Sequence, residues 1–403
     1  MFLKNKFQTL DGRWLIILGL TVYFSILGFS EVWFGTYEKT WQWLGVPARR
    51  YFIDLQVLLC GIEEFLQGHN PYTWIKCTYN YPLLWVVFSY IPYFSLAYLY
   101  QIAIVLIFLF FTGVLLFIKK TSWRNSLIYS ALLLSPSVML ALERGNNDVI
   151  IFLLIGVSLI FNAKDSKKIS YAFLLFSTFL KLYPIVAFVY VLEHVKTKKV
   201  LFLLGFGVVL LFVAYLIVIQ EQLKPIYKIH PREAFLSYGI YTLPFRIYSK
   251  VTFFSLETLK TAALLVALLG CSYFVIAQMR STQTKNLYPA EPIFFNGYLI
   301  GSAIFVSTFM AGNNFDYRFI FLIFTFPQLF NWSKITDFRR VALIQLSMMG
   351  FILWTPFLLE QSTHLYPASI VISLIKEILC WTLFFVQVKF LVLYVFQRVR
   401  LLT

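Results

Sequence analysis

The sequence predicts an all-α protein that crosses a membrane many times. Of its 403 residues, 60% are hydrophobic and only 13% are charged, whereas a soluble domain has about 25% charged residues. Apolar runs of about 20 residues recur along the chain, and each can cross a hydrocarbon core of about 30 Å as one helix. The sequence lacks the alternating segments of roughly 10 residues that form a membrane β-barrel. We therefore expect one integral-membrane domain, residues 1–403, built as a helical bundle.

Basic residues before the first apolar run orient the expected bundle. This run covers about 14–34, and Lys4, Lys6 and Arg13 precede it. The positive-inside rule therefore predicts a short cytoplasmic leader, residues 1–13. No small-residue cleavage site follows the run, so we expect a retained anchor and not a signal peptide. Residues 35–94 then form a large external loop that carries amphipathic and re-entrant helices.

The segment 81–93, "YPLLWVVFSYIPY", is apolar but short and contains Pro82 and Pro92. If it crossed the membrane completely, the basic pair Lys119-Lys120 would face outward. The positive-inside rule disfavours that arrangement. We therefore expect a re-entrant or interfacial segment, with the remaining bundle in residues 95–403.

The remaining bundle is expected to contain a hairpin broken at Lys181–Pro184. A single long helix there would place its basic end outside, and Pro184 favours a break. The other expected spans lie near 95–118, 123–141, 147–162, 199–220, 257–279, 292–310, 316–331, 341–359 and 368–395. Together with the first span and the hairpin they predict about twelve spans, with both ends in the cytoplasm.

This topology places several polar clusters on the external face. They are the first loop around Asp54, "LERGNND" (142–148), Lys181, and "GNNFDYR" (312–318). A tight Gly-Asn-Asn turn is a sufficient explanation for the asparagines. Contact with lipid headgroups is a sufficient explanation for the positions of Arg144 and Arg318. Ionisable groups at membrane depth, however, commonly line a cavity or a site, and Lys181 interrupts an otherwise apolar run.

A mixed site of this kind suits sugar transfer. One carboxylate could accept a proton from a sugar hydroxyl, while arginine and lysine hold the phosphate of an activated donor and stabilise it as it leaves. Such charge-assisted contacts strengthen where water is excluded. The many aromatic residues (44 Phe and 25 Tyr) suit sugar rings and lipid chains, but membrane interfaces contain them in any case.

At the level of motifs, the chain resembles a known family. The segments "FIDLQV", "FLQGHNPY", "YNYPLLWVVFSYIP", "LERGNNDVIIFLL", "FLKLYP" and "DYRFIFLIFTFPQL" occur in order over roughly residues 10–335. In the order of these motifs and in the membrane side on which they are expected, the chain resembles the polyprenyl-phosphate-mannose-dependent mannosyltransferases. These form glycosyltransferase family 87 of the GT-C superfamily. The resemblance implies a lipid-phosphate-linked sugar donor, inversion at the anomeric carbon, and a catalytic aspartate in the first external loop.

The resemblance and the residues together predict roles for individual side chains. Asp54 matches the catalytic position and would be the general base. Lys181, Arg144 and Arg318, in that order of preference, would bind the donor phosphate. The family often has Gly-Gln-x-Asn where this chain has Gly145–Asp148, which leaves those side chains in question. The expected substrate-binding residues are His69, Tyr72, Tyr81, Asn146, Asn147, Asp148, Asn313 and Asp316.

The expected partners follow from this assignment: a polyprenyl-phosphate sugar, with mannose as the default, a glycolipid or polysaccharide acceptor, and membrane lipids. We expect no nucleic acid, because much of the net charge of +16 lies in cytoplasmic loops. Some GT-C enzymes use a divalent metal, but no tight carboxylate pair is evident, so we expect no cofactor. We expect a monomer in a bacterial inner (plasma) membrane with its active site outside the cytoplasm.

Other interpretations stay open at this point. The number of spans alone also fits a transporter or lipid flippase without covalent chemistry, although such proteins commonly carry repeats and midplane charges. A structural assembly subunit is a third possibility. Four cysteines show no metal-type spacing. A disulfide framework is not expected, although a Cys60–Cys77 bridge on the outer face is possible.

Overall fold

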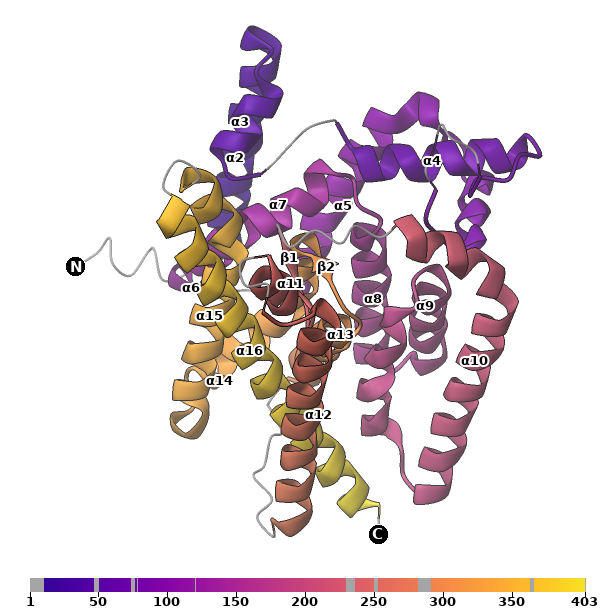
Figure 1. The fold of residues 1–403 in the computed structure, drawn as a ribbon, viewed down its shortest axis with the longest axis vertical. Helices are drawn as coiled ribbons and strands as arrows, with labels where there is room; N and C mark the ends of the chain where they lie inside the picture. Colours follow the sequence, from indigo (N-terminus) through magenta and orange to yellow (C-terminus); the bar gives the residue numbers. More distant parts are fainter. Residues whose placement is uncertain are drawn as a thin grey trace.

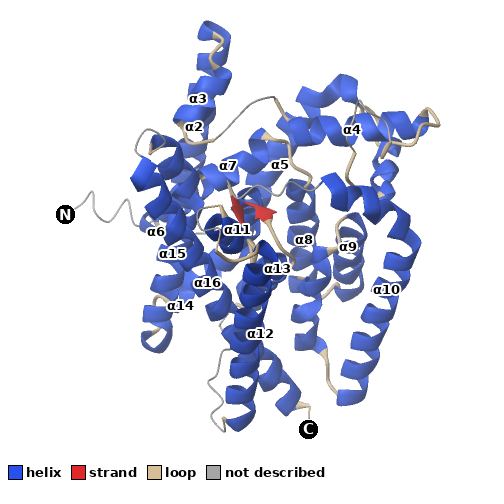
Figure 2. Cartoon of the chain, viewed as in Figure 1, coloured by secondary structure: helices blue, strands red, loops and turns tan. Residues whose placement is uncertain are grey.

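The computed structural model describes residues 11–46, 51–73, 77, 79–119, 121–229, 236–249, 253–281, 291–362 and 366–402. This part of the chain is a bundle of helices with one small antiparallel sheet (Figure 2). The first ten residues of the expected leader lie outside the described part.

The first half of the chain forms helices of very different lengths. In chain order they are α2 (Arg13–Phe34), α3 (Tyr37–Trp43), α4 (Ile53–Leu66), the 3₁₀ segments η1 (Leu83–Tyr90) and η2 (Leu96–Tyr98), α5 (Leu99–Ile118), α6 (Trp123–Leu133), α7 (Pro136–Glu143), α8 (Asp148–Ala163), α9 (Lys167–Leu180) and the 3₁₀ segment η3 (Tyr183–His194).

The second half contains most of the long helices. Its elements are α10 (Lys198–Ile229), β1 (Ser237–Tyr238), α11 (Thr242–Tyr248), α12 (Leu256–Arg280), α13 (Pro292–Met310), β2 (Asn314–Phe315), the 3₁₀ segment η4 (Asp316–Thr325), α14 (Phe326–Trp332), α15 (Thr336–Gln361) and α16 (Tyr366–Leu401). In the sheet, Ser237 pairs with Phe315 and Tyr238 pairs with Asn314.

The expected all-α polytopic membrane protein is confirmed. Within the described residues, seven helices are long and apolar enough to cross a membrane: α2, η2 with α5, α10, α12, α13, α15 and α16. The pair α6 and α7, bent by 54°, would make an eighth. The expected number of about twelve is not confirmed, because α8 and η3 are apolar but shorter than a full span.

Helix α13 is the buried centre of the bundle, and 78% of its most apolar window is buried. It packs against η3, η4 and α16. Gly297 and Gly301 allow the close approach of η4, because a Cβ at these positions would lie 2.8 Å from the Phe324 carbonyl oxygen and 2.7 Å from that of Phe321. Small residues four apart are a common device for packing membrane helices.

Two interruptions occur where the sequence predicts them. Helix α9 ends at Leu180 and η3 begins at Tyr183, which gives the break expected at Lys181–Pro184. Residues 81–93 contain only η1, whose eight residues extend about 16 Å at the usual 3₁₀ rise. The indole of Trp85 donates to the Leu180 carbonyl oxygen at 3.0 Å, so η1 is held against the end of α9.

Helix α4 lies across one end of the bundle, above the ends of α8, α9 and α10 (Figure 1). The segment that follows it is tied back by a disulfide between Cys60 and Cys77, with 5.7 Å between their Cα atoms. The ring of Tyr79 also packs on the backbone of Gly61, where a Cβ would lie 2.0 Å from the ring. Helix α4 and the described residues tied to it therefore form a fixed layer over this end.

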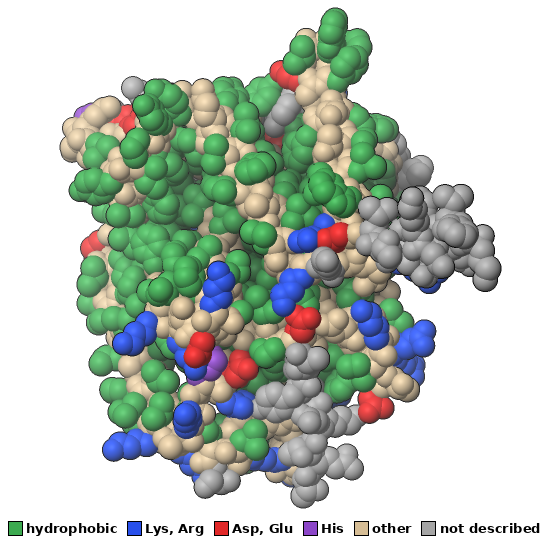
Figure 3. Space-filling view, turned by 180° about the vertical axis from the view of Figure 1, so that it is seen from behind, with side chains coloured by type: hydrophobic (Ala, Val, Ile, Leu, Met, Phe, Trp, Pro, Cys, Tyr) green, Lys and Arg blue, Asp and Glu red, His purple; other side chains and the backbone are tan. Residues whose placement is uncertain are grey.

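The two ends of the bundle differ in charge. Asp148 begins α8 at the end covered by α4, and α8 runs from there towards the opposite end. Lys and Arg side chains gather over the lower half of Figure 3, which is that opposite end, and hydrophobic side chains cover much of the upper half. Helices α10 and α12 are only 6% buried in their apolar windows, as expected for surfaces in contact with lipid.

Candidate active site

The start of α4 is docked on the turn between α7 and α8. The backbone N–H of Phe52 donates to the Glu143 carbonyl oxygen at 3.1 Å, and that of Asp54 donates to the Arg144 carbonyl oxygen at 3.0 Å. Gly145 permits this approach. Its φ is +56°, and a Cβ there would lie 2.8 Å from the Cβ of Leu55. The docking places Asp54, in the first turn of α4, beside the side chains of the turn.

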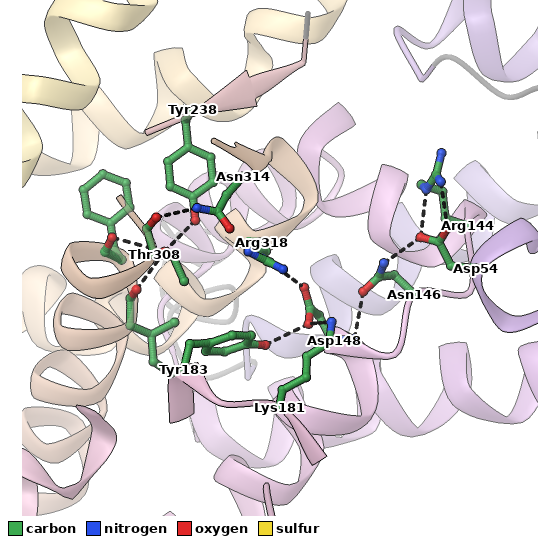
Figure 4. Close-up of polar contacts among 12 residues, drawn as sticks. Asp54, Arg144, Asn146, Asp148, Lys181, Tyr183, Tyr238, Thr308, Asn314 and Arg318 are labelled. Carbon is green, nitrogen blue, oxygen red and sulfur yellow. Dashed lines mark hydrogen bonds and ion pairs between the residues drawn. The ribbon is translucent and has the colours of Figure 1, made fainter. Parts of the chain in front are cut away.

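The Asp54 carboxylate accepts three hydrogen bonds from this turn (Figure 4). Arg144 donates from Nε to Oδ2 at 2.8 Å and from Nη2 to Oδ1 at 2.6 Å, and Asn146 donates from Nδ2 to Oδ2 at 2.6 Å. A carboxylate offers about four acceptor positions, two on each oxygen. Oδ2 is therefore saturated, and Oδ1 keeps one position. The Asp54 side chain is 13% exposed.

Asn146 connects this carboxylate to a second one. Its Oδ1 accepts the backbone N–H of Asp148 at 2.8 Å. Because the amide oxygen is used in that way, the amide nitrogen must face Asp54. The orientation of the Asn146 amide is therefore fixed by its hydrogen bond to the first turn of α8.

The Asp148 carboxylate is fully buried and collects groups from two other elements. Its Oδ1 accepts from the Tyr183 hydroxyl at 2.8 Å and is also paired with the Lys181 ammonium. Its Oδ2 lies 3.4 Å from Nε of Arg318. The break between α9 and η3 and the start of η4 therefore meet at Asp148.

Arg318 is the least bonded of the three cations around this site. The only polar contact of its guanidinium with a described residue is the 3.4 Å ion pair to Asp148, and its Nε makes no hydrogen bond. The guanidinium lies 5.4 Å from the centre of the Tyr183 ring. By contrast, Arg144 is held by two hydrogen bonds to Asp54.

These residues surround a cavity of about 430 Å³. Arg144, Lys181 and Arg318 lie on its wall, and two carboxylates pair with them, which leaves one positive charge in excess. Apolar groups form much of the remaining surface. The lining residues are Ile53, Asp54, Val57, Asn80, Tyr81, Pro82, Arg144, Asn146, Lys181, Leu182, Tyr183, Leu223, Thr308, Ala311, Asn314, Phe315, Tyr317 and Arg318.

Several groups on the wall have strongly shifted pKa values, among them Tyr81 and Arg144. Burial raises the pKa of the Tyr81 phenol well above its usual value, so Tyr81 presents a neutral hydroxyl. Burial alone would lower the pKa of the Arg144 guanidinium, but the adjacent Asp54 carboxylate outweighs this effect and raises it. The Arg144 guanidinium therefore stays protonated beside Asp54.

Comparison with known families identifies the family of the chain. The profile described as Glycosyltransferase family 87 matches residues 80–288, just over half of the chain. The chain belongs to glycosyltransferase family 87. It is therefore a multi-pass membrane glycosyltransferase, which takes a sugar donor and a glycan acceptor. No curated protein and no solved structure matches the chain in the same comparisons.

The matched segment covers only part of the pocket. Arg144, Asn146, Asp148 and Lys181 lie within residues 80–288, whereas Asp54 and Arg318 lie on either side of them. The fold brings the two outlying residues to the matched ones through the docking of α4 and the start of η4.

Several residues predicted for the site of this glycosyltransferase lie elsewhere. Asp316 faces α16, where Lys376 Nζ donates to its Oδ1 at 2.7 Å. Asn313 accepts from the Thr242 hydroxyl at 3.2 Å. Asn147 is buried, and its amide has no hydrogen-bond partner among the described residues. None of these three lines the cavity described above. The predicted Asp148 does not line it either, because its buried carboxylate is bonded to the lining residues Lys181 and Tyr183.

The remaining two predicted residues, His69 and Tyr72, line a neighbouring cavity. His69 Nδ1 lies 2.7 Å from Glu64 Oε2. The Tyr72 hydroxyl donates to the carbonyl oxygen of Tyr81 at 2.7 Å. Tyr81 itself lies on the wall of the first cavity.

Sequence reasoning missed some residues that line the cavity and one buried charge elsewhere. Asn80, Thr308 and Tyr317 line the cavity without having been predicted. It also missed the fully buried Lys376, although that residue interrupts an apolar span. A charge in such a position is the signal that could have identified it.

Metal binding is not indicated within the described residues, where no three His, Cys, Asp or Glu side chains gather as a metal site would need. Asp54 and Asp148 are occupied by cationic and amide donors instead. The expectation that the transferase needs no metal stays a prediction.

Proposed function

We propose that this family 87 protein transfers a sugar from a polyprenyl-phosphate donor to a lipid-linked or surface glycan, by a single inverting displacement in the cavity at Asp54. The observation that carries the proposal is that two groups line the same cavity. One is Asp54 Oδ1, which keeps an acceptor position, and the other is Arg318, which has few bonds. The first group suits an incoming hydroxyl, and the second suits a phosphate.

The excess charge supports a phosphate-linked donor. A phosphodiester between a sugar and a polyprenyl chain carries one negative charge, which matches the one excess positive charge around the cavity. As the sugar leaves, the phosphate gains a second negative charge. Arg318 and Lys181 would stabilise that charge where it develops, which is how positioned cations lower a barrier. Apolar lining such as Leu182 and Leu223 suits the first part of a lipid chain.

The free position on Asp54 Oδ1 supports its role as general base. An acceptor hydroxyl must come within about 2.6–3.2 Å of the base that removes its proton. Oδ1 can accept this hydrogen bond while Arg144 and Asn146 keep the carboxylate in place. A single displacement needs only one base and a good leaving group. The remaining predicted binders on the wall, Tyr81 and Asn146, would contact or orient the sugars.

Two observations favour an extracytoplasmic site. The Cys60–Cys77 disulfide lies in the layer that covers the cavity, and disulfides persist in oxidising compartments. Lysine and arginine gather at the opposite end of the molecule, as the positive-inside rule expects for the cytoplasmic side. We propose a bacterial plasma membrane, with the protein acting as a monomer.

The test is transfer by the purified full-length protein in lipid nanodiscs. Polyprenyl-phosphate mannose is the first donor, and the glucose, galactose and arabinose analogues complete the panel, each with a glycolipid acceptor. Asp54→Asn should abolish transfer, because an amide cannot take the proton. Loss of the ion pair to Arg144 should lower the thermal transition, but the variant should still unfold in one cooperative step. Asp165→Asn, at a residue whose side chain is 85% exposed at the other end, is the control and should keep full activity.

Two outcomes would contradict the proposal. Full activity of the Asp54→Asn protein would exclude Asp54 as the base. Counterflow of a lipid-linked sugar in proteoliposomes, without any covalent product from the whole panel, would favour transport without chemistry.

A further inference from the structure

Two phenols on the cavity wall take no part in the ion pairs and hydrogen bonds described above. Tyr81 and Tyr317 both line the cavity and are only 8% and 7% exposed. Neither hydroxyl makes a hydrogen bond with a described residue, and neither is fully enclosed. Both hydroxyls therefore open to the cavity. Most buried polar groups in proteins have a hydrogen-bond partner, so two neighbouring phenols without one indicate a ligand that supplies it.

The two phenols lie close to both the proposed base and the proposed phosphate cations. Each interacts electrostatically with the Asp54 carboxylate, and Tyr81 also interacts with Tyr317. On the side of the cations, Lys181 Nζ lies 6.0 Å from the centre of the Tyr81 ring. Arg318 follows Tyr317 directly in η4 and interacts with its phenol. The hydroxyls thus face the part of the cavity between Asp54 and these cations.

Both rings are held by aromatic neighbours. Tyr317 stacks on Phe315, with 5.4 Å between the ring centres and 24° between the ring planes. Tyr81 packs edge to face with Tyr79 at 5.6 Å and with Trp85 at 6.5 Å. These contacts use the rings and leave the hydroxyls open. The phenols are therefore in position before a ligand arrives, which lowers the entropy lost on binding.

The place that the phenols face is the place of the transferred sugar. In a single displacement, this sugar lies between the acceptor hydroxyl at the base and the departing phosphate at the cations. A phenol donates one hydrogen bond and can accept others, and a sugar hydroxyl does the same. A site that bonds a substrate hydroxyl discriminates strongly against an analogue that lacks it. Such contacts would therefore select the sugar.

We infer that the hydroxyl groups of Tyr81 and Tyr317 bond to hydroxyl groups of the transferred sugar and so determine which sugar the enzyme accepts. This inference rests on the proposed function. It adds Tyr317, which sequence reasoning did not predict, as a specificity-determining residue. It also specifies the donor as a neutral sugar, because the phosphodiester alone already matches the one excess positive charge around the cavity.

The experiment measures kcat/KM for the donor whose sugar is transferred best and for its deoxy analogues, each of which lacks one hydroxyl group. The full-length protein in nanodiscs is used with one glycolipid acceptor. In the wild-type protein, loss of a bonded hydroxyl should lower kcat/KM about 2- to 13-fold, the range of one neutral hydrogen bond. Tyr317→Phe should treat the full sugar and at least one deoxy analogue alike. Tyr81→Phe should do the same.

Two tyrosines outside the cavity supply matched controls. Tyr273 on α12 is 67% exposed, so Tyr273→Phe should match the wild-type protein. The Tyr238 hydroxyl lies 2.7 Å from that of Thr308 in the interior, so Tyr238→Phe should lower the thermal transition and keep every preference. Tyr317→Phe should keep the wild-type transition, because the hydroxyl that it removes has no partner among the described residues.

Three outcomes would overturn the inference. The first is a wild-type protein that transfers every deoxy sugar as well as the full one. The second is a Tyr81→Phe or Tyr317→Phe protein that keeps every wild-type preference among the donors, which would exclude that residue. The third is a preference that these variants lose only among deoxy acceptors, because the phenols would then face the acceptor.

A binding measurement separates this inference from the proposed function. Isothermal titration without acceptor uses farnesyl-phosphate mannose, glucose, galactose and arabinose with their deoxy forms, and the dissociation constants should show the same preferences. Preferences that Tyr317→Phe loses, in a protein that forms no covalent product, would contradict only the proposed function. Transfer whose donor preferences do not depend on either phenol would contradict only the inference. A protein that binds none of these donors would contradict both.

Discussion

The carboxylates of Asp54 and Asp148 differ in exposure, because Asp54 lines the cavity and Asp148 does not. Asp148 is fully buried and is surrounded by Lys181, Tyr183 and Arg318. Such a group organises its neighbours, because ionising it without them would be very costly. Asp54 is partly exposed and keeps one acceptor position on Oδ1. Chemistry is therefore expected at Asp54, and positioning at Asp148.

Arg318 is expected to be the main phosphate ligand. Arg318→Gln removes the cation with the fewest bonds and leaves Asp148 paired with Lys181. A hydrogen bond to a charged group contributes about 1.5–3 kcal/mol, so the KM for the donor should rise about 10- to 150-fold. Donor titrations in the transfer assay measure it. Arg339→Gln, at an exposed arginine after η4 and α14, is the control. An unchanged donor KM in Arg318→Gln would rule out this role.

Sequence reasoning named the four charged residues that line the cavity, but not the ion pairs that they form. Asp54, Arg144, Asn146, Lys181 and Arg318 could be placed together because each was expected in the first external loop or at the external end of a span. Lys181 was expected to bind phosphate most strongly, yet it is paired with Asp148. Which cation is left with few bonds depends on tertiary contacts, and a single sequence does not contain them.

At the scale of elements, the close contact between α13 and η4 positions Arg318. Gly301→Val should be destabilising, because a Cβ would lie 2.7 Å from the backbone oxygen of Phe321. Overpacking of this kind costs about 1–3 kcal/mol. Thermal unfolding in detergent should show a lower transition. Gly205→Val is the control, since nothing lies within 4 Å of a Cβ there on α10. Equal transitions for both variants would contradict the proposed packing role.

A buried ion pair ties the start of η4 to α16. Lys376 uses all three N–H groups, on both oxygens of Asp316 at 2.7 and 2.5 Å and on the Ser237 carbonyl oxygen at 2.9 Å. Both side chains of the pair are fully buried. The turn before Arg318 is therefore held from behind by α16.

Removing one partner of this pair should cost much more than removing both. Lys376→Met leaves the Asp316 carboxylate buried without its cation, which should lower stability by about 3–5 kcal/mol. The double variant Lys376→Met, Asp316→Leu should recover most of that loss. Chemical denaturation in detergent compares the three proteins. A double variant no more stable than Lys376→Met would show that the charge itself is not what destabilises the single variant.

The elements followed from the sequence where a long apolar run lies between polar ends. The span expected at 14–34 is α2, Arg13–Phe34, and the one expected at 292–310 is α13, Pro292–Met310. The span expected at 123–141 is bent at Ser135 and Pro136 into α6 and α7. Hydropathy records how apolar a run is, but neighbouring helices decide whether it continues straight. The number of spans is left unconfirmed for the same reason.

At the scale of the whole molecule, the ionic contacts of four separate regions collect at one end. The first loop, the α7–α8 turn, the α9–η3 break and the α13–η4 turn all contribute to the cavity. The opposite end carries the exposed basic residues seen in Figure 3. We therefore expect the basic end to face the cytoplasm, and this expectation does not depend on the proposed chemistry.

This orientation can be measured in intact cells with single cysteines. Lys224 lies near the cavity end, and Asp165 lies at the other end; their side chains are 69% and 85% exposed. In a background with Cys271→Ser and Cys380→Ser, which keeps the Cys60–Cys77 disulfide, a membrane-impermeant maleimide should label Lys224→Cys from outside. It should label Asp165→Cys only after lysis. The reverse pattern would place the cavity in the cytoplasm, where the disulfide would not persist, and would require a cytoplasmic sugar donor.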